Sequence, residues 1–173
     1  MPALAFGPDF IIESNVIAEF VADLFPNARL RPEGHSAEAA LKAAKMRFFT
    51  EVWQSKVQAL IFAPFFGPGD DEAPSKIVIA LGADIVPLLK EYDGPYVLGK
   101  EFSMADVLAH SFVLRLFAYA KAGLYGKELY GQLQDIKKVK EWHDAIASRE
   151  STKEIWDETE VVDGMKQMLK NKK

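Results

Sequence analysis

The sequence predicts a mainly α protein in which an all-helical domain follows a short α/β piece. Apolar residues recur at helical spacing from Ser14 onward, while only residues 3–12 read as short strands. The length of 173 residues, 49% of them hydrophobic, suits one substantial core and is too short for two complete domains of ordinary size. We therefore expect an α/β piece over residues 1–27, a linker over residues 28–35 and a helical domain over residues 36–173.

The composition argues against several kinds of chemistry. The chain has no cysteine, which excludes disulfides, thiolate metal sites and a cysteine nucleophile within it. Its histidines, His35, His110 and His143, are too scattered for a zinc site, so no metal is expected. The formal charge of −4 is mild and mixed along the chain, which argues against a nucleic-acid ligand. No apolar run approaches the roughly 20 residues of a membrane span, so we expect a cytoplasmic protein that binds no membrane.

The first elements are a hairpin and a helix. Two short apolar runs, residues 3–6 and 10–12, are joined by the turn residues Gly7-Pro8-Asp9. Ser14 is placed to cap the helix that follows, and we expect Pro26-Asn27 to end it. The apolar face of this helix is made by Ile17, Phe20, Val21 and Leu24.

A long helix is predicted from Ser36 to about Ala63, with two apolar stripes that make its apolar surface wider than one core contact requires. Either this is a central helix buried on two sides within its own domain, or one stripe packs inside and the other against a partner. Pro64 ends the helix, Ser75 starts the next, and Pro87 should kink or break that one. The two stripes are Leu41, Ala44, Phe48 and Val52, and Met46, Phe49, Trp53, Val57 and Leu60.

The clearest local signal is a capping box at Ser103 and Asp106. The Ser103 hydroxyl can accept a hydrogen bond from the Asp106 amide, while the Asp106 carboxylate accepts one from the Ser103 amide. The helix that starts here is apolar nearly all round as far as Leu124, which predicts the buried centre of the domain. Arg115 on that helix must meet a carboxylate, a cavity or a ligand, and an internal ion pair is expected. Residues 151–154 offer a second capping box.

Four features in this order resemble the cytosolic glutathione transferases over the whole chain. Met1-Pro2-Ala3-Leu4 is similar to the family's Val-Pro-Ala-Leu, in which the proline has a cis peptide bond. Glu13-Ser14-Asn15-Val16-Ile17 is similar to its Glu-Ser-x-x-Ile. The linker near Pro32 with its long helix resembles the family's domain join, and Phe102-Ser103-Met104-Ala105-Asp106 resembles the capping box of its sixth helix. Residues 45–66 and the region around Trp142 look most like omega-type and fungal members.

The resemblance implies a glutathione site at Met1, Pro2, Glu13 and Ser14. A helix N-terminus attracts anions, so Ser14 and the amide beside it would hold the α-carboxylate of the γ-glutamyl group, and Glu13 would pair with its α-ammonium. The Met1 carbonyl would meet the cysteinyl part. Each residue also has a structural interpretation: Ser14 as a helix cap, Glu13 as a favourable charge at the helix start, and Pro2 as a trans proline in a frayed terminus.

The family's second substrate lies between the two domains. The resemblance implies a small apolar electrophile that contacts side chains from the long helix and from the capped helix. Ordinary core is the slightly favoured interpretation of any one phenylalanine there. The candidate residues for this wall are Phe62, Phe65, Phe66, Phe112, Arg115 and Tyr119.

The resemblance implies that residues 1–27 are part of the family's thioredoxin-like, glutathione-binding domain. The strand, helix and strand that open this domain in the family carry the Tyr, Ser or Cys that contacts the glutathione sulfur, and none precedes Pro2, so no catalytic residue is assigned. The implied activity is conjugation, thiol reduction or glutathione-dependent isomerisation, for detoxification or fungal secondary metabolism. We favour a transferase in a longer native form. The alternatives are a non-catalytic interaction module, as in translation elongation factor gamma subunits, and an active chain completed by a partner subunit. Because a two-stranded remnant exposes a sheet edge, we expect a homodimer through the second stripe of the long helix.

Overall fold

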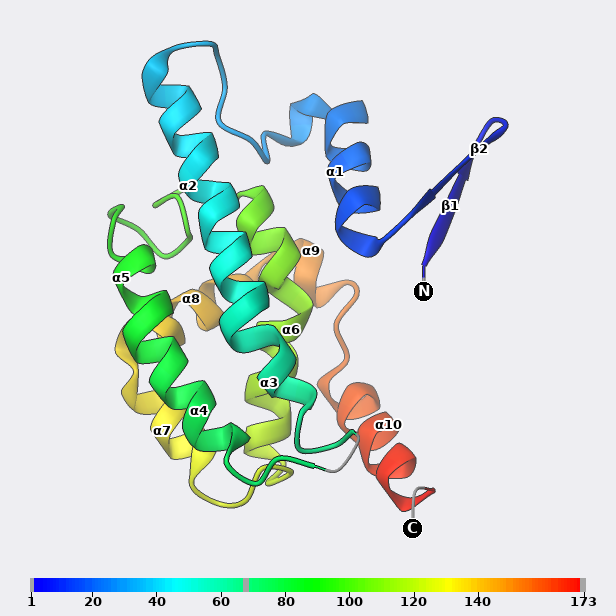
Figure 1. Cartoon of the computed structure of the whole chain (residues 1–173), viewed down its shortest axis with the longest axis vertical. Helices are drawn as coiled ribbons and strands as arrows, with labels where there is room; N and C mark the ends of the chain where they lie inside the picture. The colour runs from blue at the N-terminus through cyan, green and yellow to red at the C-terminus, as the bar shows by residue number, and fades with distance from the viewer. Residues whose placement is uncertain (1, 67–68, 172–173) are drawn as a thin grey trace.

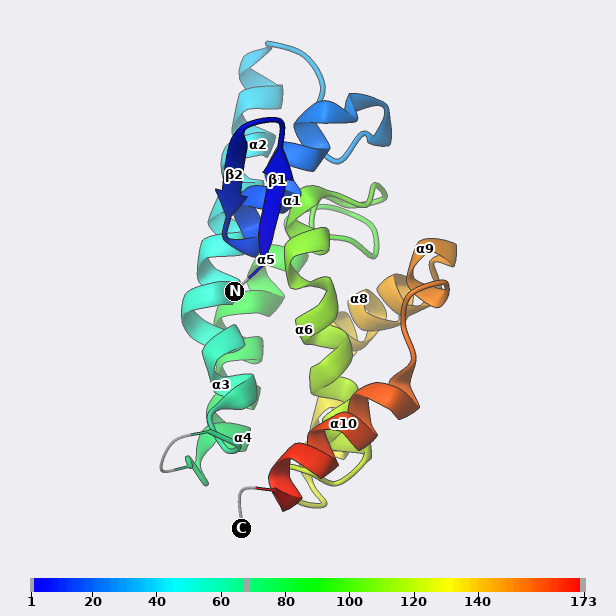
Figure 2. The same cartoon turned by 90° about the vertical axis from the view of Figure 1, so that its right-hand side faces the viewer.

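The computed structural model describes residues 2–66 and 69–171. A two-stranded hairpin stands to one side of a helical body, and helix α1 lies between the hairpin and that body (Figure 1). The long helix α2 (Ala37–Trp53) and the buried helix α6 (Met104–Lys121) run along the body, and α10 (Glu158–Lys170) follows the lower part of α6 near the C-terminus (Figure 2). No helix within the described residues is long and apolar enough to cross a membrane.

The hairpin matches the prediction. Strands β1 (Ala3–Phe6) and β2 (Asp9–Ile12) pair antiparallel with Ala3 opposite Ile12. Gly7 adopts φ 60° in the turn, a conformation that costs glycine little. The Phe6 ring packs edge-on against Phe20 of α1 at 5.1 Å between centroids, so the hairpin is attached through that helix.

Helix α1 (Ser14–Leu24) is followed by a 3-10 turn, Pro26–Ala28, as the Pro26-Asn27 pair predicts. Its packing is thin, because Ala22 is its buried residue and much of its apolar surface faces outward. The exposed apolar side chains on α1 are Val16, Val21 and Leu24.

Helix α2 (Ala37–Trp53), a π-helical segment (Gln54–Gln58) and α3 (Ala59–Phe62) form the predicted long helix. The Ser36 hydroxyl caps it by accepting a hydrogen bond from the Ala39 amide at 3.1 Å. One apolar stripe is buried through Met46, Phe49, Trp53 and Val57, whereas Leu41, Ala44 and Phe48 of the other are exposed. Burial on two sides within the domain is therefore wrong for the second stripe.

The next helix begins earlier than Ser75. Helix α4 spans Ala73–Ala80 with Pro74 in its first turn, where a proline loses no intrahelical hydrogen bond. A π-helical segment, Leu81–Ile85, leads into α5 (Val86–Leu89) and precedes Pro87 in it, so the regular α pattern breaks where the proline predicts.

Helix α6 (Met104–Lys121) is the centre of the core, with most of its residues buried. Around it lie α7 (Leu129–Asp135), α8 (Lys137–Ser148), α9 (Glu150–Lys153) and α10 (Glu158–Lys170).

The predicted capping box at residues 151–154 is wrong. Helix α9 is a short turn that begins at Glu150, and its N-cap residue is Arg149. Thr152 is buried, and its hydroxyl lies 2.9 Å from Nε2 of His110 on α6, within hydrogen-bond distance. This contact ties the turn to the core.

Candidate functional site

The start of α1 carries the two candidate glutathione residues that the structure describes best. Glu13 occupies the N-cap position and Ser14 is the first helical residue, and no side chain caps the helix. The prediction of Ser14 as a helix cap is therefore wrong, because a cap needs an extended backbone outside the helix. Both side chains are exposed. The first amides of this helix are left for another acceptor.

Glu13 is held in an unusual backbone conformation. Its φ is 73° and its ψ 121°, in a region that residues with a Cβ rarely adopt. Its carbonyl accepts the first helical hydrogen bond, from the Ile17 amide at 2.9 Å. Strain of this kind costs of order 1–3 kcal/mol and occurs mainly at functional sites. The strained residue and the uncapped helix start are adjacent.

The other two candidate glutathione residues lie at the chain start. Met1, with the peptide bond that joins it to Pro2, lies outside the described residues, so the cis geometry implied by the resemblance stays a prediction. Pro2 is exposed and directly precedes β1.

The start of α6 is built in the opposite way, around the predicted capping box of Ser103 and Asp106. The Asp106 carboxylate accepts hydrogen bonds from the Ser103 amide at 2.8 Å and from its hydroxyl at 2.7 Å. It also accepts from the Val97 amide at 3.0 Å and from Trp142 Nε1 at 2.9 Å. Burial raises the pKa of this carboxyl, and the hydrogen bonds oppose that rise. Both residues are structural, as predicted.

Five of the six candidate residues for the second-substrate wall fall into two aromatic groups, and Arg115 lies outside both. The Phe62 ring lies 6.0 Å from Phe66 and 6.2 Å from Phe112, centroid to centroid, which joins α3 to α6. The Phe65 ring instead packs against Tyr119 at 5.9 Å and Tyr125 at 5.0 Å. Phe65 and Tyr119 are buried, whereas Phe66 is exposed and Phe62 and Phe112 are half-buried. The first group therefore offers the more accessible surface.

Arg115 has no ion pair within the described part of the chain, so the predicted internal pair is wrong. Its guanidinium donates to the Ser111 carbonyl at 3.0 Å and lies over the ring of Trp156, 5.8 Å from the centroid. Burial raises the pKa of Tyr119, while nearby Arg115 opposes the rise. Sequence reasoning did not name Trp156 as this partner, because no local pattern indicates a contact between α6 and the segment after α9.

His110 lies on the same helix as Arg115. Burial is the main cause that lowers its pKa, and the positive charges of Arg115 and Arg149 lower the pKa further. The imidazole is therefore favoured in its neutral form.

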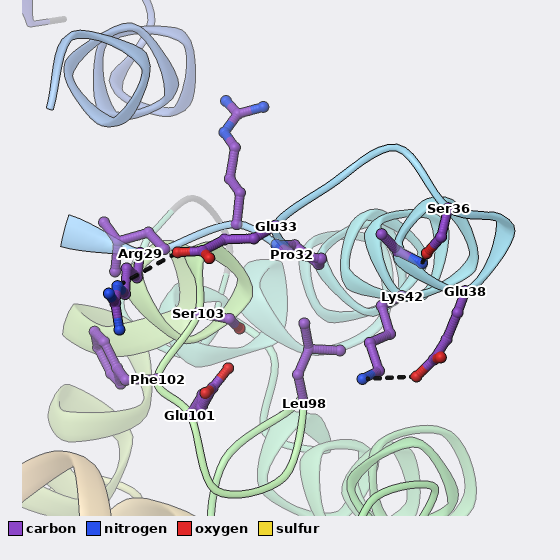
Figure 3. A pocket seen from close by; sticks show the side chains of 13 residues that line it. Arg29, Pro32, Glu33, Ser36, Glu38, Lys42, Leu98, Glu101, Phe102 and Ser103 are labelled. Atoms are coloured by element: carbon purple, nitrogen blue, oxygen red, sulfur yellow. Dashed lines mark hydrogen bonds and ion pairs between the residues drawn. The ribbon is translucent and has the colours of Figure 1, made fainter. Parts of the chain in front are cut away.

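One cavity lies at the linker and another lies between α1 and the helical body. The first, of about 250 Å³, is bounded by the linker, the start of α2 and the loop before α6. Figure 3 shows that charged side chains around it pair with one another, Arg29 with Glu33 and Lys42 with Glu38. A smaller cavity of about 110 Å³ lies between α1, α2 and α6. Across residues 2–66 and 69–171, no group of three His, Cys, Asp or Glu side chains is placed to hold a metal ion.

The same arrangement of elements occurs in solved glutathione transferases. Omega 1C from Trametes versicolor superposes with a TM-score of 0.77 at 24% identity, covering 93% of this chain and 66% of that one. Omega 2C from the same fungus superposes with a TM-score of 0.75 at 27% identity, covering 94% of this chain and 69% of that one. The chain has the fold of the cytosolic glutathione transferases. A rice glutathione transferase solved in complex with glutathione gives a TM-score of 0.72 at 21% identity, with 98% and 76% covered.

The chain spans about two thirds of the length of the first of these transferases. No family model and no curated protein sequence matches it. The candidate residues lie in two parts of this fold. Glu13 and Ser14 lie at the start of α1, and the aromatic candidates for the second-substrate wall lie on α3, on α6 and in the segment after α3.

Proposed function

We propose that the chain is a glutathione-transferase-type protein that binds glutathione at the start of α1 and a small apolar electrophile against the rings of α3 and α6. The observation that carries the proposal is the uncapped start of α1 directly after the strained residue Glu13. The fold supports it, since its solved neighbours are glutathione transferases and the rice neighbour was solved with glutathione.

The proposed recognition follows from charge. Glutathione carries an α-carboxylate and an α-ammonium on its γ-glutamyl end. The free amides and dipole of an eleven-residue helix favour the carboxylate, with the Ser14 hydroxyl as an added donor. The exposed Glu13 carboxylate favours the ammonium. The accessible rings of Phe62, Phe66 and Phe112 would pack against the electrophile.

The reaction proposed for the longer transferase is attack of the glutathione thiolate on an electrophilic carbon, which forms a sulfur–carbon bond as the leaving group or a π-electron pair departs. The residues named here recognise the substrates, and activation of the sulfur stays unassigned. Thiol reduction and glutathione-dependent isomerisation would use the same glutathione site. The proposed site is compatible with a role in detoxification or in fungal secondary metabolism.

Isothermal titration calorimetry with glutathione tests the binding proposal. We expect a measurable heat for the unmodified chain and roughly tenfold weaker binding for Ser14→Ala and for Glu13→Ala, each losing one charge-assisted contact. Ser151→Ala, which changes an exposed serine on α9, is the matched control and should bind as the unmodified chain does. Unchanged heats for both site variants would remove the proposed site. A chain without glutathione affinity that associates with other proteins would fit the interaction-module interpretation.

We also propose that a second copy of the chain packs on the exposed stripe of α2. Phe48 is 57% exposed and Leu41 56%, a large apolar surface for one face of a helix. Size-exclusion chromatography with light scattering should show a dimer that Phe48→Glu converts to a monomer. Ile155→Glu changes a comparably exposed apolar residue elsewhere and should leave the dimer intact. A monomeric unmodified chain would contradict this proposal.

A further inference from the structure

The linker holds two helices through adjacent residues. The Leu30 carbonyl accepts a hydrogen bond from the amide of Met104, the first residue of α6, at 2.7 Å. The next residue, Arg31, turns toward α1, where its guanidinium pairs with Glu19 at 2.7 Å and with Asp23 at 3.4 Å. Two consecutive residues of the linker thus connect α6 with α1.

These ion pairs matter for the orientation of α1, because this helix has little apolar packing of its own. Ala22 is the buried residue of α1, and a helix held by so few core contacts can rotate or tilt at low cost. The Arg31 side chain is 31% exposed and that of Glu19 41%, so solvent screens this pair less than one on an open surface. A guanidinium that contacts two carboxylates one helical turn apart also fixes rotation about the helix axis.

The same contact borders the gap between α1 and the helical body. Glu19 lines the cavity of about 110 Å³ between α1, α2 and α6. By holding Glu19, Arg31 fixes one side of this gap relative to the other, which is formed by α2 and α6. The remaining lining residues are Met46, Arg47, Thr50, Glu51, Met104, Ala105 and Leu108.

We propose that Arg31 is a positioning residue that sets the orientation of α1 against α6 and so aims the α1 N-terminus at its ligand. This rests on the proposed glutathione site only for its last step. The orientation of α1 is a property of the chain that can be measured without any ligand.

Arg29 provides a matched control on the same linker. Its Nε pairs with Glu33 at 3.3 Å, and the two side chains are 80% and 72% exposed (Figure 3). This pair lies within the linker, and among the described residues neither partner forms an ion pair with α1 or α6. Removing it changes the linker charge by the same amount without touching the helix.

The first experiment measures glutathione affinity by calorimetry. We expect Arg31→Met to weaken binding by about three- to tenfold, Arg31→Lys by less because one ion pair can re-form, and Arg29→Met by less than about twofold. The loss caused by Arg31→Met should shrink at high salt, since screening weakens the same ion pairs in the unmodified chain. Equal affinity for Arg31→Met and the unmodified chain would overturn the proposal.

The second experiment measures the helix orientation directly. The chain has no cysteine, so cysteines introduced at the exposed positions Val16 on α1 and Ala122 at the C-terminal end of α6 can be spin-labelled cleanly. Double electron–electron resonance should give a narrow distance distribution for the unmodified chain and for Arg29→Met, and a broadened or displaced one for Arg31→Met. An unchanged distribution for Arg31→Met would overturn the proposal whether or not glutathione binds. Absence of glutathione heat in the unmodified chain would instead count against the proposed function alone.

Discussion

Helices α1 and α6 begin in opposite ways, although both starts carry a serine and a nearby carboxylate. At α6, Ser103 and Asp106 form a buried capping box, and two further donors, from Val97 and Trp142, reach the same carboxylate. At α1, no side chain caps the helix, and Ser14 and Glu13 are exposed.

The difference separates a structural role from a recognition role. A buried helix start must have its amides satisfied within the protein, which the α6 start achieves with Asp106. An exposed start can leave its amides to water or to an anion, and the strained φ of Glu13 adds a cost that packing does not explain. Variants at Asp106 and Glu13 test whether the two starts differ as this comparison requires.

The largest expected effect is at the α6 start. Asp106→Ala leaves buried donors of Ser103, Val97 and Trp142 without an acceptor, so we expect the free energy of unfolding to fall by about 3–5 kcal/mol. Urea denaturation followed by circular dichroism measures this. Trp142→Phe removes one donor from the same carboxylate and leaves space in the core, so it should cost about 2–3 kcal/mol. A loss below about 1 kcal/mol for Asp106→Ala would show that this start is not structural.

A smaller effect concerns acid stability on the α6 side. The His143 ring of α8 stacks on Phe117 of α6 at 3.9 Å, and burial lowers its pKa although its bond to Asp144 opposes that. Since the folded pKa lies below the ordinary 6.5, its contribution to stability is present above pH 6.5 and is lost as the pH falls through 6.5 toward the folded pKa. The melting temperature should therefore fall by a few degrees on acidification.

Histidine variants check this assignment. His143→Phe should flatten the pH dependence of the melting temperature, because a phenylalanine can keep the stack without titrating. His35→Gln alters an exposed linker histidine and is the control. An unchanged pH profile in His143→Phe would place the acid sensitivity elsewhere, such as at His110, whose pKa burial also lowers.

Contacts between residues close in sequence could be predicted, whereas contacts that depend on how distant segments pack could not. The bond between Ser103 and Asp106 was predictable because it joins residues three apart at a helix start. The bonds to Asp106 from Val97 and Trp142 were not, since they depend on how a loop and α8 pack. Arg115 was singled out as a charge on an apolar helix, yet its partner, the Trp156 ring, could not be named because the segment that brings it near has no local signal. The cap assigned to Ser14 was wrong because Ser14 is the first helical residue, whereas a capping side chain belongs to the residue before the helix.

The smallest stability effect is expected at the α1 start. Glu13→Gly should raise the free energy of unfolding by about 1 kcal/mol, because glycine adopts a positive φ without the Cβ penalty. The same change should weaken glutathione binding, because the carboxylate is lost. Glu33→Gly, which changes another exposed glutamate in a non-helical segment, is the control and should give no stabilisation. A loss of stability in Glu13→Gly would contradict strain at this residue.

The most direct test of the recognition role follows the amides themselves. In ¹⁵N–¹H NMR titrations, the Ser14 and Asn15 amide signals should shift saturably with glutathione and stay in place with cysteinylglycine, which lacks the γ-glutamyl group. The Asp106 amide at the closed α6 start should shift with neither ligand. Equal responses of the α1 amides to both ligands, or no response to glutathione, would contradict the claim that the open start of α1 binds the γ-glutamyl end.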